Sequence, residues 1–394
     1  MKSPKLDVNF FDRAIIADPF PYYEQIRALG PVVWNEFLHG WMLTGYDDCT
    51  AVLGDTGGRF VMMNSDPEIF PWFEDRNMIT VDGAAHHRLR TCLAPLFTRR
   101  AVAHWERRVG EVVDELLAPV AQGGVSFDLI ADFTQVPTII VAEMLGVPRE
   151  RHDDFMRWSS TIAGGLAYGH EDAAARARLK QASAELNGYL REEIARHRRE
   201  LPDDLFTTIL RAADAGSMTD DEVRSTAVLM MAAGYDTTAK LLSNALVAFE
   251  VNPGQRDLLI ERPELVPDAV EEVLRWTGVT QAIPRAAVVD TELAGQPIAA
   301  GDAVFALVTA AGRDPQRWAD PLRFDVTRER KTNYGFGYGP HLCLGLHLAR
   351  LEAKVAIERL LDVAGKFRLR DLEYGSSFFV RGPERGVLDI PVRA

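Results

Sequence analysis

Residues 224–250 constrain the fold more than any other part of this 394-residue chain. They form the most apolar run with helical periodicity, and only a few polar residues, such as Asp236, Lys240 and Asn244, interrupt it. A membrane-spanning helix is the first alternative, but these polar residues and the lack of a positive flank count against it. We therefore predict no membrane association and a buried central helix within a large hydrophobic core.

The other elements predict a mainly α fold with small β-sheets. A mostly helical pattern spans about 98–275, and a last helix runs to about Leu361. Strand-like runs are predicted at 31–34, 41–44, about 286–307, and near 378–380 and 388–392. Because strands and helices do not alternate regularly, a doubly wound βαβ architecture is not expected.

We expect one domain over residues 1–394, with a β-richer part over about 1–80 and a helix-rich remainder. No linker, low-complexity tract or internal repeat divides the chain. The three cysteines, at 49, 92 and 343, show no paired spacing, and the N-terminus lacks an apolar leader. These features indicate the reducing cytoplasm. A monomer is also expected. The net charge of −13 argues against nucleic-acid binding.

The segment 86–108 reverses this charge, because it contains six arginines and a single acidic residue. The plain interpretation is a solvated helix face. The functional interpretation is an anion site, or a docking surface for an acidic protein partner.

Cys343 stands in the segment F-G-Y-G-P-H-L-C-L-G, residues 336–345, and a helical pattern follows it directly. The glycines allow the backbone to approach a flat, bulky group closely. A cysteine at a helix N-terminus is expected to be stabilised as a thiolate by the unpaired N–H groups and the macrodipole. Such a thiolate in an apolar loop suits axial ligation of haem iron. The alternatives are an inert packing residue and a neighbour of a phosphate site.

Asp236 and Thr237 are unusual in an apolar helix, as is Gly234 just before them. The Thr237 hydroxyl can donate to the carbonyl of Ala233, four residues back. One interpretation is a satisfied polar pair in the core. The other is a local widening that holds a small molecule, with a carboxyl and a hydroxyl group to relay protons.

Glu272 and Arg275 lie one helical turn apart and are predicted to pair. This spacing occurs by chance in many helices and often gives only a weak surface ion pair.

Together, these motifs resemble the cytochrome P-450 superfamily of haem-thiolate monooxygenases, in its soluble bacterial form. Residues 336–345 match the haem-binding pattern F-G-x-G-x-H-x-C-x-G at every fixed position, and residues 233–238 match the oxygen-activation motif. The helix pair Glu272–Arg275, with Arg323 as its third member, and the H-H-R-L-R segment 86–90 are similar to two further motifs of the family.

The resemblance implies haem b, with Cys343 as the axial iron ligand and Asp236 and Thr237 as the proton-delivering catalytic residues. His86, Arg90, Arg285 and His341 would hold the haem propionates. The other expected cofactor contacts are Phe336, Gly337, Gly345 and Ala233. Because Gly83, Ala84 and Ala85 depart from the usual pattern before His86, the neighbouring His87 remains an alternative.

The resemblance also implies a substrate pocket facing the haem. Its predicted residues are Leu229, Ala232, Ala233, Val279, Thr280, Phe379, Val380, Met78 and Ile79. The segment 60–79 also contains Phe70, Trp72 and Phe73 and is expected to form a lid. Since Met side chains adapt to shape, an apolar and bulky substrate is expected.

The implied reaction inserts one oxygen atom from O2 into an apolar small molecule, by hydroxylation, epoxidation or dealkylation. Peroxide-driven oxidation and a non-catalytic haem-thiolate sensor are the alternatives. Electrons would come from an acidic ferredoxin or flavodoxin with its reductase, docking near Arg99, Arg100, Arg107 and Arg108.

Overall fold

The computed structural model describes residues 4–63, 76–121, 126–128, 132–168, 173–375 and 377–391. The α-helices are α1 (Arg13–Ala17), α2 (Phe20–Leu29), α3 (Tyr46–Leu53), α4 (Gly83–Leu93), α5 (Arg99–Val102), α6 (Glu106–Ala121), α7 (Val136–Met144), α8 (His152–Tyr168), α9 (Ala173–Glu200), α10 (Leu205–Asp214), α11 (Asp220–Val251), α12 (Pro253–Glu261), α13 (Val266–Trp276), α14 (Val308–Ala311) and α15 (Leu346–Ala364). The strands are β1 (Lys5–Leu6), β2 (Val32–Asn35), β3 (Gly40–Leu43), β4 (Phe60–Met62), β5 (Ser126–Asp128), β6 (Ile283–Ala287), β7 (Thr291–Leu293), β8 (Gln296–Ile298), β9 (Ala303–Ala306), β10 (Arg368–Tyr374) and β11 (Pro383–Asp389).

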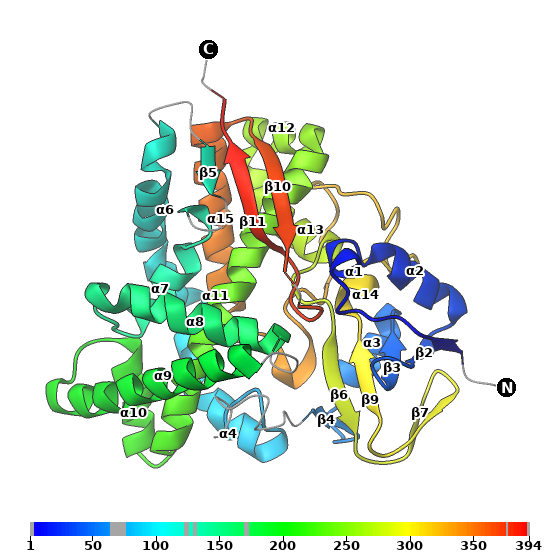
Figure 1. The fold of residues 1–394 in the computed structure, drawn as a ribbon, viewed down its shortest axis with the longest axis horizontal. Helices are drawn as coiled ribbons and strands as arrows, with labels where there is room; N and C mark the ends of the chain where they lie inside the picture. Colours follow the sequence, from blue (N-terminus) through cyan, green and yellow to red (C-terminus); the bar gives the residue numbers. More distant parts are fainter. Residues whose placement is uncertain are drawn as a thin grey trace.

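Helix α11 is the predicted central helix, and it packs against α7, α8, α13 and α15 (Figure 1). It begins at a capping box, in which Thr219 accepts from the Glu222 N–H and Glu222 accepts from the Thr219 N–H. Most of its residues are buried. None of the helices in the described part of the chain combines the length and apolar character that a membrane crossing requires.

A six-stranded sheet lies on the opposite side of the molecule from α8–α10 (Figure 1). Its strand order is β1-β2-β3-β9-β6-β4, so strands from the start of the chain pair with strands near residue 300. The strands predicted at 31–34 and 41–44 are confirmed as the antiparallel pair β2 and β3. β9 pairs with β3 in parallel. A parallel pair requires a long connection, and here the chain between β3 and β9 contains most of the helices.

One strand prediction is wrong, and strands β5 and β10 were not predicted. Strand β5 falls inside the span predicted as helical, and it pairs with β11 in a three-stranded sheet. Residues 378–380 form no strand; Phe378 and Phe379 are apolar because they pack in an aromatic cluster with Phe10 and Phe11. The terminal hairpin is instead β10 and β11. Strand β10 was missed because its side chains are mostly exposed and charged, which leaves no apolar alternation.

The loop that contains Cys343 lies just before α15 and close to α3 and α13. A Cβ on Gly339 would come within 2.2 Å of the Leu53 carbonyl oxygen, and a Cβ on Gly335 within 2.7 Å of the Leu274 Cβ. Gly339 also has a φ of +73°, which favours glycine. The loop therefore passes its neighbours at distances that only glycine permits.

Candidate active site

A cavity is lined by residues of α11 and of the segment 336–345. The structure brings to its walls every residue predicted to contact a cofactor: Cys343, His86, Arg90, Arg285, His341, Phe336, Gly337, Gly345 and Ala233. These residues come from four separate parts of the chain. Tertiary packing therefore assembles one site from the four segments.

Cys343 does not sit within a helix, because α15 begins at Leu346 with Gly345 as its N-cap. Its backbone N–H donates to the Phe336 carbonyl at 2.9 Å. Burial raises the pKa of the Cys343 thiol, against the opposing effects of a Gly345 backbone hydrogen bond and of Arg90 and Arg350. Desolvation therefore outweighs these stabilising effects on the thiolate. A cation beside the sulfur would reverse this balance.

His86 and His341 stand side by side at one end of the cavity, with ring centroids 4.2 Å apart. His341 Nε2 lies 2.8 Å from Oδ1 of Asp82, whereas the buried Nε2 of His86 has no hydrogen-bond partner among the described residues. Burial, His341 and Arg90 lower the pKa of His86 to about 4. His86 rather than His87 faces the site, since His87 is exposed.

Arg90 and Arg285 add two guanidinium groups to this end of the cavity. Burial lowers the pKa of both. Neither lies within ion-pair distance of a carboxylate in the described part of the chain, although Asp82 acts on Arg285 at longer range. Buried cations and an orphaned imidazole nitrogen, without matching anions, fit a ligand that brings its own carboxylates.

On α11, the predicted bond from Thr237 Oγ1 to the Ala233 carbonyl is confirmed at 2.7 Å, and Thr237 lines the cavity. Asp236 does not line it; its Oδ2 instead accepts from Lys240 Nζ at 2.9 Å. A Cβ on Gly234 would lie 2.8 Å from Cγ2 of Val141. This glycine therefore also lets α7 pack closely on α11.

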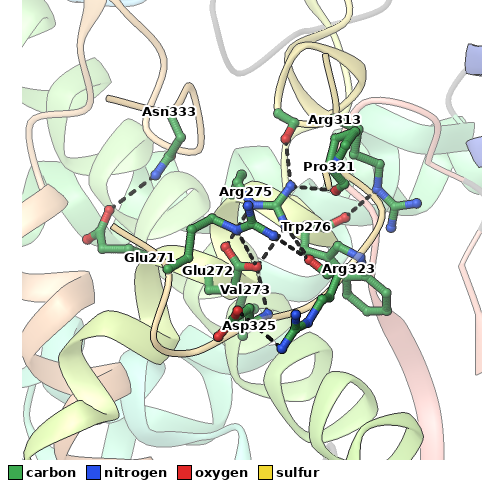
Figure 2. A network of polar contacts seen from close by, with 12 residues as sticks. Glu271, Glu272, Val273, Arg275, Trp276, Arg313, Pro321, Arg323, Asp325 and Asn333 are labelled. Carbon is green, nitrogen blue, oxygen red and sulfur yellow. Dashed lines mark hydrogen bonds and ion pairs between the residues drawn. The ribbon is translucent and has the colours of Figure 1, made fainter. Parts of the chain in front are cut away.

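The predicted pair of Glu272 and Arg275 forms the centre of a buried polar network (Figure 2). Arg275 donates to both carboxylate oxygens of Glu272 at 2.7 Å. Its remaining N–H groups donate to the carbonyls of Gly312, Pro321 and Arg323. The pair therefore ties α13 to the segment that leads toward the Cys343 loop.

The prediction that the Arg323 side chain completes this pair is wrong. That side chain is 64% exposed and lies 3.5 Å from Asp325, so Arg323 contributes only its backbone carbonyl. The third charged member is Arg328, whose Nε lies 3.2 Å from Oε1 of Glu272. The turn after Arg323 carries the chain back over Glu272, which also accepts from the Asp325 N–H.

Of the predicted pocket residues, Leu229, Ala233, Val279, Thr280, Met78 and Ile79 line the cavity, whereas Ala232, Phe379 and Val380 do not. Ala232 packs in the helical core, and Phe379 contacts the rings of Phe305 and Phe378. Val380 forms an isolated β-bridge with Thr280. Phe70, Trp72 and Phe73 of the predicted lid lie outside the described residues.

No sequence pattern indicated that α7 contributes to the cavity. Val141 and Met144 of this helix line the cavity. Nearly all residues of α7 are buried, so no polar face distinguishes its cavity side from its core side.

Comparison with known proteins identifies the relatives of this chain. The family described as cytochrome P-450 matches residues 172–261 and 255–370. Mycinamicin IV hydroxylase/epoxidase from Micromonospora griseorubida is 36% identical over 364 residues, 89% of this chain and 89% of that protein. Vitamin D(3) 25-hydroxylase from Pseudonocardia autotrophica is 34% identical over 391 residues, 96% of this chain and 95% of that protein.

A solved structure shares the fold closely. P-450BioI, in complex with an acyl carrier protein ligated to hexadec-9Z-enoic acid, matches with a TM-score of 0.89 and 30% identity. The match covers 96% of this chain and 100% of that chain.

Proposed function

The chain belongs to the cytochrome P-450 family of haem monooxygenases, and from this premise we propose that it inserts one oxygen atom of O2 into an apolar small molecule. The observation that carries the proposal is one cavity that Cys343 and Thr237 line together with a cluster of cationic side chains. Haem b, when bound, supplies the activation of O2 and the transfer of oxygen.

Three groups of the chain's own residues would hold this cofactor. Cys343 Sγ would be the axial ligand of the iron, because it is the cysteine on the cavity wall. His86, Arg90, Arg285 and His341 would hold the two propionates by charge-assisted hydrogen bonds. Phe336, Gly337, Gly345 and Ala233 would contact the porphyrin ring, since none of them carries a charged side chain that would need solvation.

Thr237 and Asp236 would supply protons to the reaction. The Thr237 hydroxyl donates to the Ala233 carbonyl, and Thr237 lines the cavity. Asp236 is the adjacent acid, and its link to Lys240 keeps it within a polar network. The two residues could thus pass a proton from that network to the cavity while the apolar walls exclude bulk water.

The substrate would be apolar. Leu229, Val279, Met78 and Ile79 line the cavity with aliphatic and thioether groups. Thr280 adds one hydroxyl that could orient a polar group of the substrate. The reaction would be a hydroxylation, an epoxidation or a dealkylation, and the named activities of the relatives support the first two.

Electrons would come from an acidic ferredoxin or flavodoxin. α5 packs against α15, and Arg99 is near enough to His347 of α15 to contribute to its lowered pKa, after burial and Arg350. Arg99 and Arg100 are exposed, and the Arg107 side chain is 81% exposed. Arg108 differs, because Glu143, Glu111 and Glu115 surround its guanidinium. Arg107 also pairs with Glu111, so the charges without an ion-pair partner in the described part of the chain are those of Arg99 and Arg100.

The proposal is tested by measuring product formation with O2 and an electron donor, and separately with peroxide. Screening apolar compounds for the haem absorbance change on binding would first identify a substrate. O2-dependent oxidation of that substrate with a ferredoxin and its reductase is expected. More efficient oxidation with peroxide alone would instead indicate a peroxygenase. Ligand binding without product under either supply would indicate a haem-thiolate sensor.

A further inference from the structure

Lys240 is a buried cation in the middle of α11. Its side chain is only 6% exposed. Its Nζ lies 2.9 Å from Asp236 Oδ2, 3.5 Å from Glu384 Oε1 and 3.4 Å from the Val380 carbonyl oxygen. An ammonium group has three N–H donors, so each of these acceptors can take one. A buried charge is costly unless it is paired in this way.

The chain after β10 passes directly over Lys240. A Cβ on Gly382 would lie 2.7 Å from both Cβ and Cγ of Lys240. The same stretch is tied to α11 one turn further on, where Asn244 Nδ2 donates to the Arg381 carbonyl at 2.9 Å. Residues 377–382 are therefore docked on α11 by two side chains, and Lys240 is the charged one.

These residues also form hydrogen bonds with the cavity wall. The Arg381 N–H donates to the Val279 carbonyl at 2.8 Å, and Val380 forms a β-bridge with Thr280. Val279 and Thr280 line the cavity, whereas Asp236 and Lys240 do not. A continuous set of contacts thus leads from the substrate side of the cavity, through residues 377–382 and Lys240, to Asp236.

We propose that Lys240 is a positioning residue that couples occupancy of the substrate cavity to the placement of the Asp236 carboxylate. A ligand that displaces Val279 and Thr280 shifts the Val380 carbonyl. The ammonium then redistributes its hydrogen bonds between the hairpin and Asp236. This inference rests on the proposed role of Asp236 in proton delivery, and it adds the element that controls that role.

The test compares Lys240→Met with Lys240→Arg in the haem-loaded protein, with the exposed Lys366→Met as the matched control. Amide hydrogen exchange of residues 377–382 is measured with and without phenylimidazole as a cavity-filling probe. Product formed per electron pair consumed is measured with the same proteins.

In Lys240→Met, exchange over residues 377–382 is expected to be about tenfold faster and insensitive to the probe. Product per electron pair is expected to fall several-fold, with little change in KM. Lys240→Arg is expected to restore both, and Lys366→Met to change neither. If Lys240→Met does not fold, Glu384→Gln removes the negative charge of one partner while Asp236 still pairs with Lys240, and a partial loss of the probe response is expected.

Unchanged exchange, or faster exchange with full coupling of electrons to product, would overturn the inference. Asp236→Asn separates it from the proposed function. If Asp236→Asn keeps full coupling, proton delivery by Asp236 is wrong. The link between Lys240 and residues 377–382 would still be judged by the exchange rates alone.

Discussion

Arg275 holds both carboxylate oxygens of Glu272 in a forked ion pair, with Nε 2.7 Å from Oε2 and Nη2 2.7 Å from Oε1. The two side chains are 1% and 4% exposed. Such a pair repays the cost of removing its charges from water only when the geometry is bidentate and the remaining donors are satisfied. Both conditions hold here, because three backbone carbonyls accept the other N–H groups of Arg275.

Arg275→Met should therefore leave the buried Glu272 carboxylate without its bidentate partner and with only Arg328 and the Asp325 N–H to compensate it. We expect a loss of about 3–5 kcal/mol in the free energy of unfolding, measured by denaturant titration of the haem-loaded protein. The exposed Arg323→Gln is the control and should cost under about 1 kcal/mol. An equal loss in both variants would contradict the placement of Arg323 at the surface.

Cys343→Ser should remove thiolate ligation without unfolding the protein. A serine hydroxyl is a much poorer ligand for haem iron, so the thiolate-dependent features of the haem absorption spectrum should disappear. Cys92→Ser, a partly exposed cysteine outside the cavity lining, should keep the wild-type spectrum. The assignment of Cys343 fails if its serine variant retains the same spectrum.

Thr237→Ala should uncouple electron consumption from product formation. The variant loses the hydroxyl that bonds the Ala233 carbonyl at the cavity wall, and with it the proposed proton donor. We expect product per electron pair to fall about tenfold or more. Thr237→Ser keeps a hydroxyl at the same place and should retain most of the coupling. Full coupling in the alanine variant would exclude this role.

Neutralising Arg99 and Arg100 together should weaken the salt dependence of reduction by ferredoxin. Exposed charges steer an acidic partner through long-range attraction, and salt screens that attraction. Arg108→Gln is the matched comparison, because its charge is already compensated by Glu143. It should leave the salt dependence unchanged. Stopped-flow reduction at several ionic strengths would show whether the exposed pair behaves differently.

Glu352 should make stability fall as pH rises. Its buried carboxyl lines the cavity, its Oε1 has no hydrogen-bond partner among the described residues, and burial raises its pKa from 4.5 to about 8. Between these values the unfolded chain loses the proton while the folded protein keeps it. The stabilising contribution of the protonated Glu352 carboxyl to the free energy of unfolding is therefore complete below pH 4.5 and is lost as the pH rises through 8.

Glu352→Gln should remove this dependence. The denaturant midpoint of the variant relative to wild type should rise across that pH window, while the exposed Glu261→Gln should track the wild-type protein throughout. Parallel pH curves for Glu352→Gln and wild type would show that Glu352 does not titrate in this way.

The sequence alone determined those features that depend on local spacing. The period of the apolar residues identified α11. The three-residue step from Glu272 to Arg275 put both side chains on one helix face, and the pattern around Cys343 identified the loop before α15. Backbone geometry sets these relationships whatever the rest of the chain does.

Only the tertiary structure decided the relationships between residues far apart in the chain. It selected Arg328 rather than Arg323 as the partner of Glu272, and it selected His86 over His87. It also placed Glu384 and the Val380 carbonyl beside the Lys240 ammonium. No local pattern encodes these contacts, because they depend on which backbone segments pack side by side and on which buried charges need partners there.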